Sequence, residues 1–312
     1  DVYKRQGLYV PGGTAPLLST VLMLAIPAQI AGCKEIVLCS PPNKEGKLPP
    51  AILYAANLCG VTKIIKVGGI QAIAAYTFGT ATIPQVYKIF GPGNQFVTVA
   101  KQLATKFGVA IDMPAGPSEL LVVADDSANA SYVASDLLSQ AEHGADSQVI
   151  LVSTSKKLIA AVSIEIQKQL EVLPRVAIAQ QAIYNSKSIF VENDEIALAL
   201  INEYGPEHFI VCTENNDFYI DNIANVGSVF IGNYTPESAG DYASGTNHTL
   251  PTNGFTKAYS GVNLDSFTKS ITFQEISKEG IQNIGKSIEI MAAAEGLQAH
   301  KNAVTLRLKD LK

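Results

Sequence analysis

Short apolar segments alternate with longer helix-like segments along most of this chain of 312 residues. The short segments have the length and the branched side chains typical of β-strands, and several end in a glycine-containing turn. Strict alternation of strand and helix predicts parallel strands joined by right-handed crossovers, which is an α/β fold. Ligands of such folds bind at the carboxyl ends of the strands. The expected strands cover residues 7–10, 35–39, 63–67, 86–90, 120–124, 148–153, 188–191, 209–212 and 228–231.

The segment Asp112-Met113-Pro114-Ala115-Gly116-Pro117-Ser118-Glu119 divides these strands into two series. Its prolines and glycine are typical of a crossing between lobes. We therefore predict two Rossmann-like lobes with parallel sheets, residues 7–118 and 119–262, followed by a C-terminal helical tail over residues 263–312. Residues 232–259 are rich in Gly, Ser, Thr, Asn and Pro, and a loop of that length in a compact domain is usually functional.

Composition excludes several classes of partner. Hydrophobic residues make up 47% of the chain and charged residues 16%, as in a well-buried globular protein. The net charge is −5 and there is no dense run of Lys or Arg, which argues against nucleic acid or an anionic membrane as the main partner. The longest apolar run, residues 15–31, is too interrupted to span a membrane.

The cysteines and the first residues carry less information. Cys33, Cys39, Cys59 and Cys212 show no C-x-x-C spacing and lie in or beside apolar segments, so we expect buried free thiols in a reducing compartment. Residues 1–6 match nothing that follows, and we expect them to be an artefact of the end of the sequence.

The stretch Leu137-Leu138-Ser139-Gln140-Ala141-Glu142-His143-Gly144 reads as the end of a helix stopped by Gly144. Gln140 and His143 are three residues apart, so they project from the same side of that helix. An amide oxygen, an imidazole and a carboxylate would then meet where the chain turns. On this segment alone, ordinary solvated polar residues are the simpler interpretation.

The four histidines, His143, His208, His248 and His300, are all expected at turns or helix ends near carboxylates. For any one of them a surface or structural role is the simpler interpretation. Together they make a divalent metal site plausible, most often zinc. The pair Glu207-His208 is the best candidate for general acid–base chemistry, although Glu207 could equally cap the turn.

The signal for a dinucleotide is weak. Gly91-Pro92-Gly93-Asn94-Gln95-Phe96 follows an expected strand and opens a helix, but Phe96 replaces the third glycine of G-x-G-x-x-G. The glycine pairs at 12–13 and 68–69 also lie at strand-to-helix turns and could admit a phosphate or a ribose. Ordinary turn geometry explains them equally well.

Taken together, these segments resemble histidinol dehydrogenases, from Gly7 to the C-terminus. The family's N-terminal segment is not matched by any part of this sequence. The matching stretches are Gly7-Leu8-Tyr9-Val10-Pro11-Gly12-Gly13, Phe90-Gly91-Pro92-Gly93-Asn94, the segment at 112–119, residues 135–144, Gly205-Pro206-Glu207-His208, residues 236–248 and Ala299-His300-Lys301-Asn302-Ala303-Val304.

The resemblance implies a zinc- and NAD-dependent oxidation of L-histidinol through an aldehyde to L-histidine, in a cytoplasmic homodimer with shared sites. It implies that His208 takes the hydroxyl proton and that Glu207 activates water for the second oxidation. The implied zinc ligands are Gln140, His143, Asp241 and, from the other subunit, His300. The implied NAD contacts are Tyr9, Gln71 and Asn94. The implied substrate contacts are Ser118, Gln140, His143, His208, Asp241, His248, Glu295 and His300.

The resemblance also implies that the first lobe is the NAD side, that the second carries the metal and catalytic residues, and that the tail is exchanged between subunits.

Two other functions stay open on the residues alone. One is a zinc hydrolase that uses the Glu207-His208 pair, although no H-E-x-x-H motif supports it. The other is a non-catalytic remnant.

Overall fold

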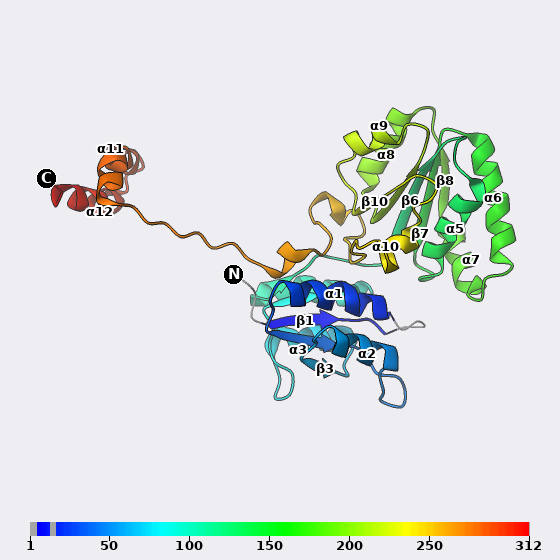
Figure 1. Cartoon of the computed structure of the whole chain (residues 1–312), viewed down its shortest axis with the longest axis horizontal. Coiled ribbons are helices and arrows are strands. Elements are labelled where there is room, and N and C mark those ends of the chain that lie inside the picture. The colour runs from blue at the N-terminus through cyan, green and yellow to red at the C-terminus, as the bar shows by residue number, and fades with distance from the viewer. Residues whose placement is uncertain (1–4, 13–16, 312) are drawn as a thin grey trace. The chain divides into compact units, whose positions relative to one another are not determined.

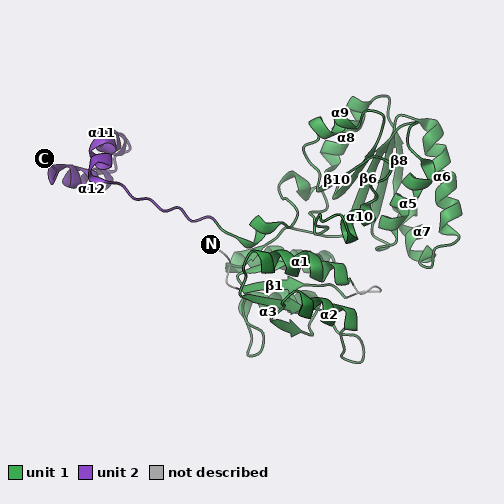
Figure 2. Cartoon of the chain, in the orientation of Figure 1, with its two compact units in different colours: residues 1–269 green, residues 270–312 purple. Residues whose placement is uncertain are grey.

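The protein is described by a computed structural model that covers residues 5–12 and 17–311. The chain divides into two compact units, residues 1–269 and 270–312 (Figure 2). Within the described residues, the first unit contains two five-stranded parallel sheets, which confirms the predicted α/β class with two parallel-sheet lobes. The second unit is a pair of helices, α11 (Lys278–Ala294) and α12 (Gln298–Lys309).

The first sheet has the strand order β3-β2-β1-β4-β5. The chain builds outward from β1 to β3, then returns to the other side of β1 to add β4. The point between β1 and β4 is therefore the topological switch point, where ligands of such sheets bind beyond the carboxyl ends. The strands are β1 (Arg5–Tyr9), β2 (Glu35–Cys39), β3 (Lys63–Ile65), β4 (Lys88–Phe90) and β5 (Ala110–Ile111).

Helices cover both faces of this sheet (Figure 1). Successive strand residues point to opposite faces, so Leu8 packs with the first two helices and Tyr9 with the next two. Both groups of side chains are almost fully buried. The helices are α1 (Leu18–Ile30), α2 (Pro50–Leu58), α3 (Gly69–Phe78) and α4 (Gln95–Ala104), and α4 continues into the short helix η1 (Thr105–Phe107).

The second sheet repeats the topology of the first, with the order β10-β9-β6-β7-β8. Its switch point lies between β6 and β9, which pair in parallel with Leu120 opposite His208. The amino ends of these two strands therefore lie side by side. The strands are β6 (Glu119–Ala124), β7 (Gln148–Ser153), β8 (Lys187–Phe190), β9 (His208–Cys212) and β10 (Ser228–Ile231).

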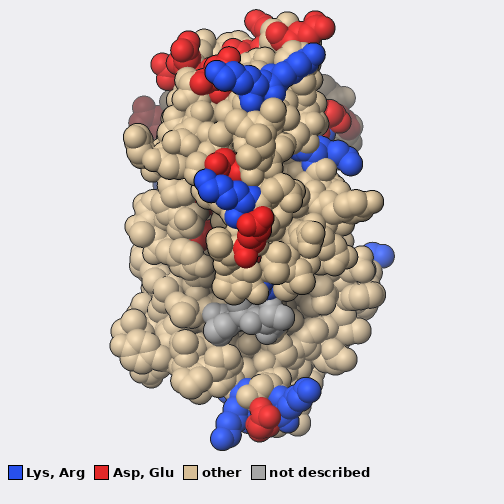
Figure 3. Space-filling view, turned by 90° about the vertical axis from the view of Figure 1, so that its right-hand side faces the viewer, with Lys and Arg blue, Asp and Glu red and all other residues tan. Residues whose placement is uncertain are grey.

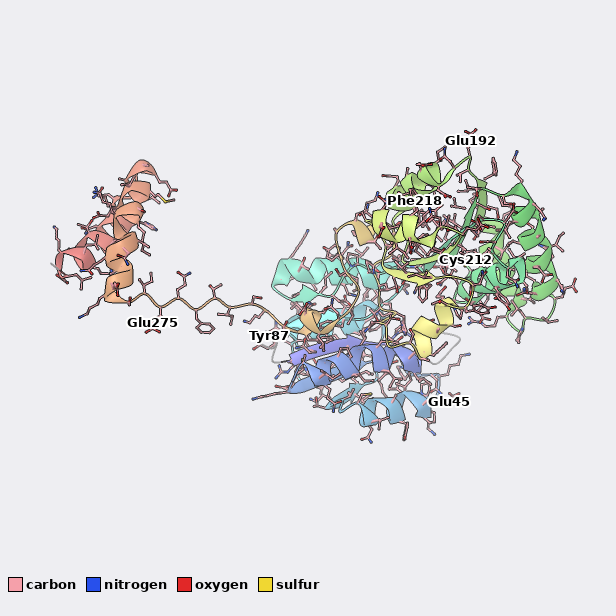
Figure 4. All side chains as sticks on the ribbon, turned by 45° about the horizontal axis from the view of Figure 1, so that its top comes forward. Glu45, Tyr87, Glu192, Cys212, Phe218 and Glu275 are labelled. Atoms are coloured by element: carbon pink, nitrogen blue, oxygen red, sulfur yellow. The ribbon has the colours of Figure 1, made fainter. Side chains whose placement is uncertain are left out.

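This second sheet is also buried on both faces. Leu120 and Val122 contribute to the core beneath one set of helices, and Leu121 and Val123 to the core on the opposite face. Cys212, at the end of β9, is buried in the first of these cores (Figure 4). The first set comprises α5 (Ala130–Ala141), α6 (Lys156–Leu170) and α7 (Val176–Asn185), and the second α8 (Asp194–Tyr204) and α9 (Asn216–Asn222).

The structure corrects two local predictions. Arg5 and Gln6 belong to the fold, because both lie in β1 and Arg5 forms an ion pair with Glu35 on the adjacent strand, with Nε 2.6 Å from Oε2. Residues 1–4 and Gly13 lie outside the described residues. Gly144 is not the helix stop either, since α5 ends at Ala141 with an ordinary right-handed cap at Glu142.

The long polar stretch at 232–259 is not purely a loop. It contains the helix α10 (Glu237–Tyr242) and the short helix η2 (Phe255–Lys257), and η3 (Leu264–Phe267) follows. Only six residues long, α10 gives too short a periodic pattern for sequence analysis to detect. Glu237 and Asp241 are four residues apart in the sequence, so α10 places them on one helical face.

A buried ion pair holds the turn after β4. Lys101 Nζ lies 2.5 Å from Asp112 Oδ1 and donates to the Gly91 carbonyl oxygen at 2.6 Å, and Asp112 Oδ2 accepts from the Gly91 N–H at 2.7 Å. Both charged side chains are at most 1% exposed. Gly91 has φ +121°, and a Cβ there would lie 2.1 Å from the Tyr9 carbonyl oxygen, so only glycine fits. The carboxyl ends of β1 and β4 are thereby locked together.

The surface shows no concentrated charge on the face seen in Figure 3, where acidic and basic side chains are scattered among uncharged ones. This agrees with the small net charge of −5. Among the described residues, every helix is too short or too polar to cross a bilayer.

Candidate active site and metal centre

A small cavity of about 80 Å³ lies between the two sheets of the first unit. One wall comes from the carboxyl side of the first sheet, where Pro92 follows β4 and Leu17 precedes α1. The opposite wall comes from the amino ends of β6 and β9 and from α10. The predicted site residues that line it are Ser118, His143, Glu207, His208, Asp241 and His248. The structure thus brings six of the twelve predicted site residues to one cavity, although these six are scattered over more than one hundred positions of sequence.

The second lobe presents its chemistry at the amino ends of its strands, and not at the carboxyl ends as the general rule predicts. Glu119 begins β6, and Glu207 and His208 stand at the start of β9. The segment at 112–118 leads directly from β5 to this edge, so the edge faces the carboxyl side of the first sheet. The cavity therefore combines the ligand-binding edge of one sheet with the opposite edge of the other.

One residue positions both candidate acid–base groups. His208 Nδ1 lies 3.1 Å from the Glu119 carbonyl oxygen, and the Glu119 N–H donates to Glu207 Oε2 at 2.9 Å. If Nδ1 carries the proton and donates to that carbonyl, Nε2 has a free lone pair. His208 Nε2 is buried and has no hydrogen-bond partner among the described residues. This is the arrangement expected of a base awaiting a proton from a bound molecule.

Burial controls the protonation of this pair. It lowers the pKa of His208 to about 3, because the imidazolium would lose its hydration there, and His248 and His143 lower the pKa further. It raises the pKa of Glu207 well above its usual value, and the nearby Glu237, Glu119 and Asp241 carboxylates raise it further. At neutral pH, His208 is therefore neutral and able to accept a proton.

This shift predicts a pH dependence of stability. Because the folded-state pKa of His208 is below the ordinary value of 6.5, the unfolded chain binds a proton first as the pH falls. The stabilisation is complete above about pH 6.5 and is lost toward pH 3. We expect the free energy of unfolding of wild type, relative to that of His208→Asn, to fall by about 1 kcal/mol as the pH is lowered from about 7.5 to about 5.5.

Urea denaturation of both proteins at the two pH values measures this difference. The buried carboxylates with raised pKa have the opposite pH dependence, but they are present in both proteins and cancel. A difference that does not change with pH would contradict the burial of a neutral His208.

A second group of side chains could hold a metal ion. Ligand atoms of His143, Glu237 and Asp241 all lie within 4.8 Å of one another. His143 stands in the turn after α5, and the two carboxylates come from one face of α10. Gln140, fully buried in the last turn of α5, lies against Glu237. Gln140 and His143 thus both lie near Glu237, although only Gln140 is in the helix.

The chemistry of this group fits a divalent cation such as zinc. Surrounding protein atoms displace water from the His143 ring and so lower its pKa, which favours the neutral imidazole that binds metals. Glu237 and Glu207 are 1% and 5% exposed, and no Lys or Arg is among the residues that line the cavity. Buried carboxylates normally pair with a cation or coordinate a metal. A metal ion would compensate these charges.

Ser118 and His248 also line the cavity. His248 Nε2 is buried and, like His208 Nε2, has no hydrogen-bond partner among the described residues. Two unpartnered imidazole nitrogens in one small cavity indicate a polar ligand, because unmatched buried polar atoms are uncommon.

The residues predicted to contact NAD lie on the first lobe. Tyr9 ends β1, and its hydroxyl accepts a hydrogen bond from the Gly69 N–H at 3.0 Å. Gln71 is in the first turn of α3, beside Gly69. Asn94 caps α4, with its side chain accepting from Val97 N–H at 3.1 Å, and lines a separate cleft of about 750 Å³. Tyr9 and Asn94 thus flank the switch point between β1 and β4.

Glu295 and His300 lie in the second unit. Glu295 follows the last turn of α11, and His300 is in the first turn of α12. Their predicted roles as substrate contact and metal ligand stay predictions.

Sequence analysis missed two acidic residues, Glu237 and Glu119. Glu237 lies four residues before the predicted ligand Asp241, and this helical spacing was the available signal. It carried no weight because the surrounding stretch was expected to be a loop. Glu119 was noted only as part of the inter-lobe crossing. It contacts Glu207 and His208 through its backbone N–H and carbonyl oxygen, and the residue type does not predict such contacts.

Two Rossmann-like parallel sheets enclose the cavity, and a His/Glu/Asp group beside it could hold a metal ion, as in an α/β enzyme. The sequence profile of histidinol dehydrogenases matches residues 2–308. Histidinol dehydrogenase from Bacteroides fragilis (strain YCH46) is 64% identical over 99% of this chain and 72% of its own length. That of Mannheimia succiniciproducens is 56% identical with the same coverage. The chain belongs to the histidinol dehydrogenase family.

Solved structures agree with this family assignment. The crystal structure of histidinol dehydrogenase from Elizabethkingia anophelis matches with a TM-score of 0.96 and 61% identity, over 99% of this chain and 72% of the other. A propionaldehyde dehydrogenase from Rhodopseudomonas palustris matches with a TM-score of 0.53 at 14% identity, over 86% and 72% of the two chains, and shares the fold alone. Family membership favours a dehydrogenase over the zinc hydrolase that the residues had left open.

Proposed function

We propose that this chain catalyses the zinc-dependent oxidation of L-histidinol, through L-histidinal, to L-histidine, with two NAD molecules reduced in turn. This is the last step of histidine biosynthesis. The observation that carries the proposal is the buried, unpartnered Nε2 of His208 in the cavity that His143 and Asp241 also line. On one cavity, a proton acceptor would take the hydroxyl proton of an amino alcohol, and a bound cation would hold its imidazole and amine.

In the first oxidation, Nε2 of His208 accepts the proton of the substrate hydroxyl, while a hydride leaves the carbon that carries this hydroxyl. The Glu119 carbonyl holds the imidazole in the required tautomer through Nδ1. NAD supplies the hydride acceptor. Because His208 is neutral at working pH, it needs no prior deprotonation.

In the second oxidation, Glu207 accepts a proton from the water that adds to the aldehyde, and the hydrate then loses a second hydride. Burial raises the pKa of Glu207 well above its usual value, which strengthens this carboxylate as a base. The Glu119 N–H bond to Oε2 fixes its direction.

Gln140, His143 and Asp241 would hold the zinc, together with His300 of the partner subunit. Zinc has no redox chemistry of its own and supplies a positive centre that orients the imidazole and amine of the substrate. Ser118, His248 and Glu295 would contact the substrate, and Tyr9, Gln71 and Asn94 would contact NAD. We propose a cytoplasmic homodimer with shared sites.

Incubation with L-histidinol and NAD tests the proposal. We expect NADH absorbance that depends on histidinol, with two NADH formed for each histidinol consumed, and loss of this activity when a chelator removes the metal. Formation of a single NADH with accumulation of aldehyde would contradict the second step. No NADH at all from metal-loaded protein would overturn the proposed function.

The shared site predicts complementation between two inactive variants. His300→Asn should lower zinc occupancy and activity, and His208→Asn should lower activity. In a mixed dimer, the site that keeps His208 also receives His300 from the other subunit, so one of two sites is intact. Mixing the unfolded variants and refolding them together should therefore restore NADH formation. If His300 served its own subunit, both sites of the mixed dimer would be defective and no activity would return.

A further inference from the structure

We propose that Glu237 is a positioning residue that orients the Gln140 side chain, so that the amide oxygen of Gln140 faces the metal, and that Glu237 is not itself a ligand. The inference rests on the proposed function, because it concerns the same metal centre. It assigns a role to a buried carboxylate that neither the sequence patterns nor the proposed reaction had used.

The contact between the two side chains is short and fully enclosed. Gln140 is 0% exposed and Glu237 is 1% exposed. The two ends of the Gln140 amide both find suitable partners only when its nitrogen faces Glu237. In that orientation the nitrogen donates to Glu237 Oε1 at 2.6 Å and to Oε2 at 3.2 Å.

This contact decides which end of the amide can reach the metal. A glutamine side chain carries a donor end and an acceptor end of nearly equal shape, and only the oxygen binds a cation. Beside a bound cation the Glu237 carboxyl would be ionised, and an ionised carboxylate only accepts hydrogen bonds. It would then draw the nitrogen toward itself and turn the oxygen away. A charge-assisted hydrogen bond also polarises the amide and strengthens its oxygen as a ligand.

Glu237 nevertheless lies close enough to be a ligand. Its carboxylate is within 4.8 Å of the ligand atoms of His143 and Asp241. The geometry favours the positioning role because both oxygens are within hydrogen-bond distance of the Gln140 nitrogen. Removal of Glu237 would weaken metal binding under either role. The two roles differ in whether the effect of Glu237 requires Gln140.

A double-mutant cycle separates them. The proteins are wild type, Glu237→Leu, Gln140→Ala and the double variant, each in the full chain, with zinc affinity measured by competition with a chelator. We expect each single variant to weaken zinc binding by about 10- to 100-fold. We expect the double variant to bind zinc no more weakly than Gln140→Ala alone. A further, multiplicative loss in the double variant would overturn the proposal, because Glu237 would then act on the metal without Gln140.

The conservative variant Glu237→Gln guards against a folding defect, since its carbonyl oxygen can still accept from the Gln140 amide. It should retain most of the zinc affinity, and it should keep the visible absorption spectrum of the cobalt-substituted protein. A spectrum changed as strongly as that of Gln140→Ala would show a lost ligand and overturn the proposal. Glu171→Gln, which makes the same change at the end of α6, is the control and should bind zinc as wild type does.

These outcomes are distinct from failure of the proposed function. If wild type oxidises histidinol and binds zinc while the cycle is multiplicative, only the role of Glu237 is wrong. If wild type binds no zinc, the proposed metal centre and the role of Glu237 both fall.

Discussion

A His208→Asn variant is expected to lose about 10²- to 10⁴-fold in kcat, the usual contribution of a positioned general base. Asparagine is close in size and can still donate to the Glu119 carbonyl, but it cannot accept the substrate proton as the Nε2 atom does. The zinc content should stay at the wild-type level, because His208 is not among the proposed ligands. Steady-state NADH formation and metal analysis on the same preparation measure both quantities.

The residual activity of this variant gives a second test of the role of His208. With the base removed, hydroxide from solution becomes the alternative proton acceptor, so the remaining rate should rise with pH. A variant that loses zinc in proportion to its activity would show that His208 supports the metal centre and not the proton transfer.

Lys101→Met is expected to destabilise the fold by about 3–5 kcal/mol, because it leaves the Asp112 carboxylate buried without its cation. Asp112 is 0% exposed, and its partner lies 2.5 Å away. Urea denaturation followed by circular dichroism measures the loss. The double variant Lys101→Met, Asp112→Leu removes the unpaired charge and should recover part of the stability.

An exposed ion pair provides the matched control. Lys257 Nζ lies 3.2 Å from Glu203 Oε1, and the two side chains are 40% and 88% exposed. Lys257→Met should cost about 1 kcal/mol or less, because solvent screens such pairs. Equal losses for Lys101→Met and Lys257→Met would contradict a special role for the buried pair.

Much of the fold could be predicted because the strands are short, apolar and separated by clear turns. The strand at Glu35–Cys39 was predicted to the residue. The strand β5 escaped prediction because it is only two residues long. Strand order could not be predicted, since it depends on which segments pack together and not on the local pattern. The repeated order of the two sheets is visible only in the structure.

The candidate site was predictable to a different extent. Spacing predicted that Gln140 and His143 lie on one side of a helix end, but α5 ends at Ala141 and His143 is in the turn that follows. Spacing could not bring Asp241 or His248 to the same cavity, and for these the resemblance to a family was needed. Glu237 escaped both approaches, because the role proposed for it acts through the Gln140 side chain and not directly on the metal or the substrate.

The shared attachment of Glu207 and His208 to Glu119 has a consequence for the aldehyde. His208 Nδ1 and Glu207 Oε2 are 3.6 Å apart, and adjacent residues carry them. In the proposed reaction, the carbon that is oxidised once stays within reach of the group that serves the next oxidation. A reactive intermediate that does not have to travel has little opportunity to escape into solution or to modify amines elsewhere in the cell.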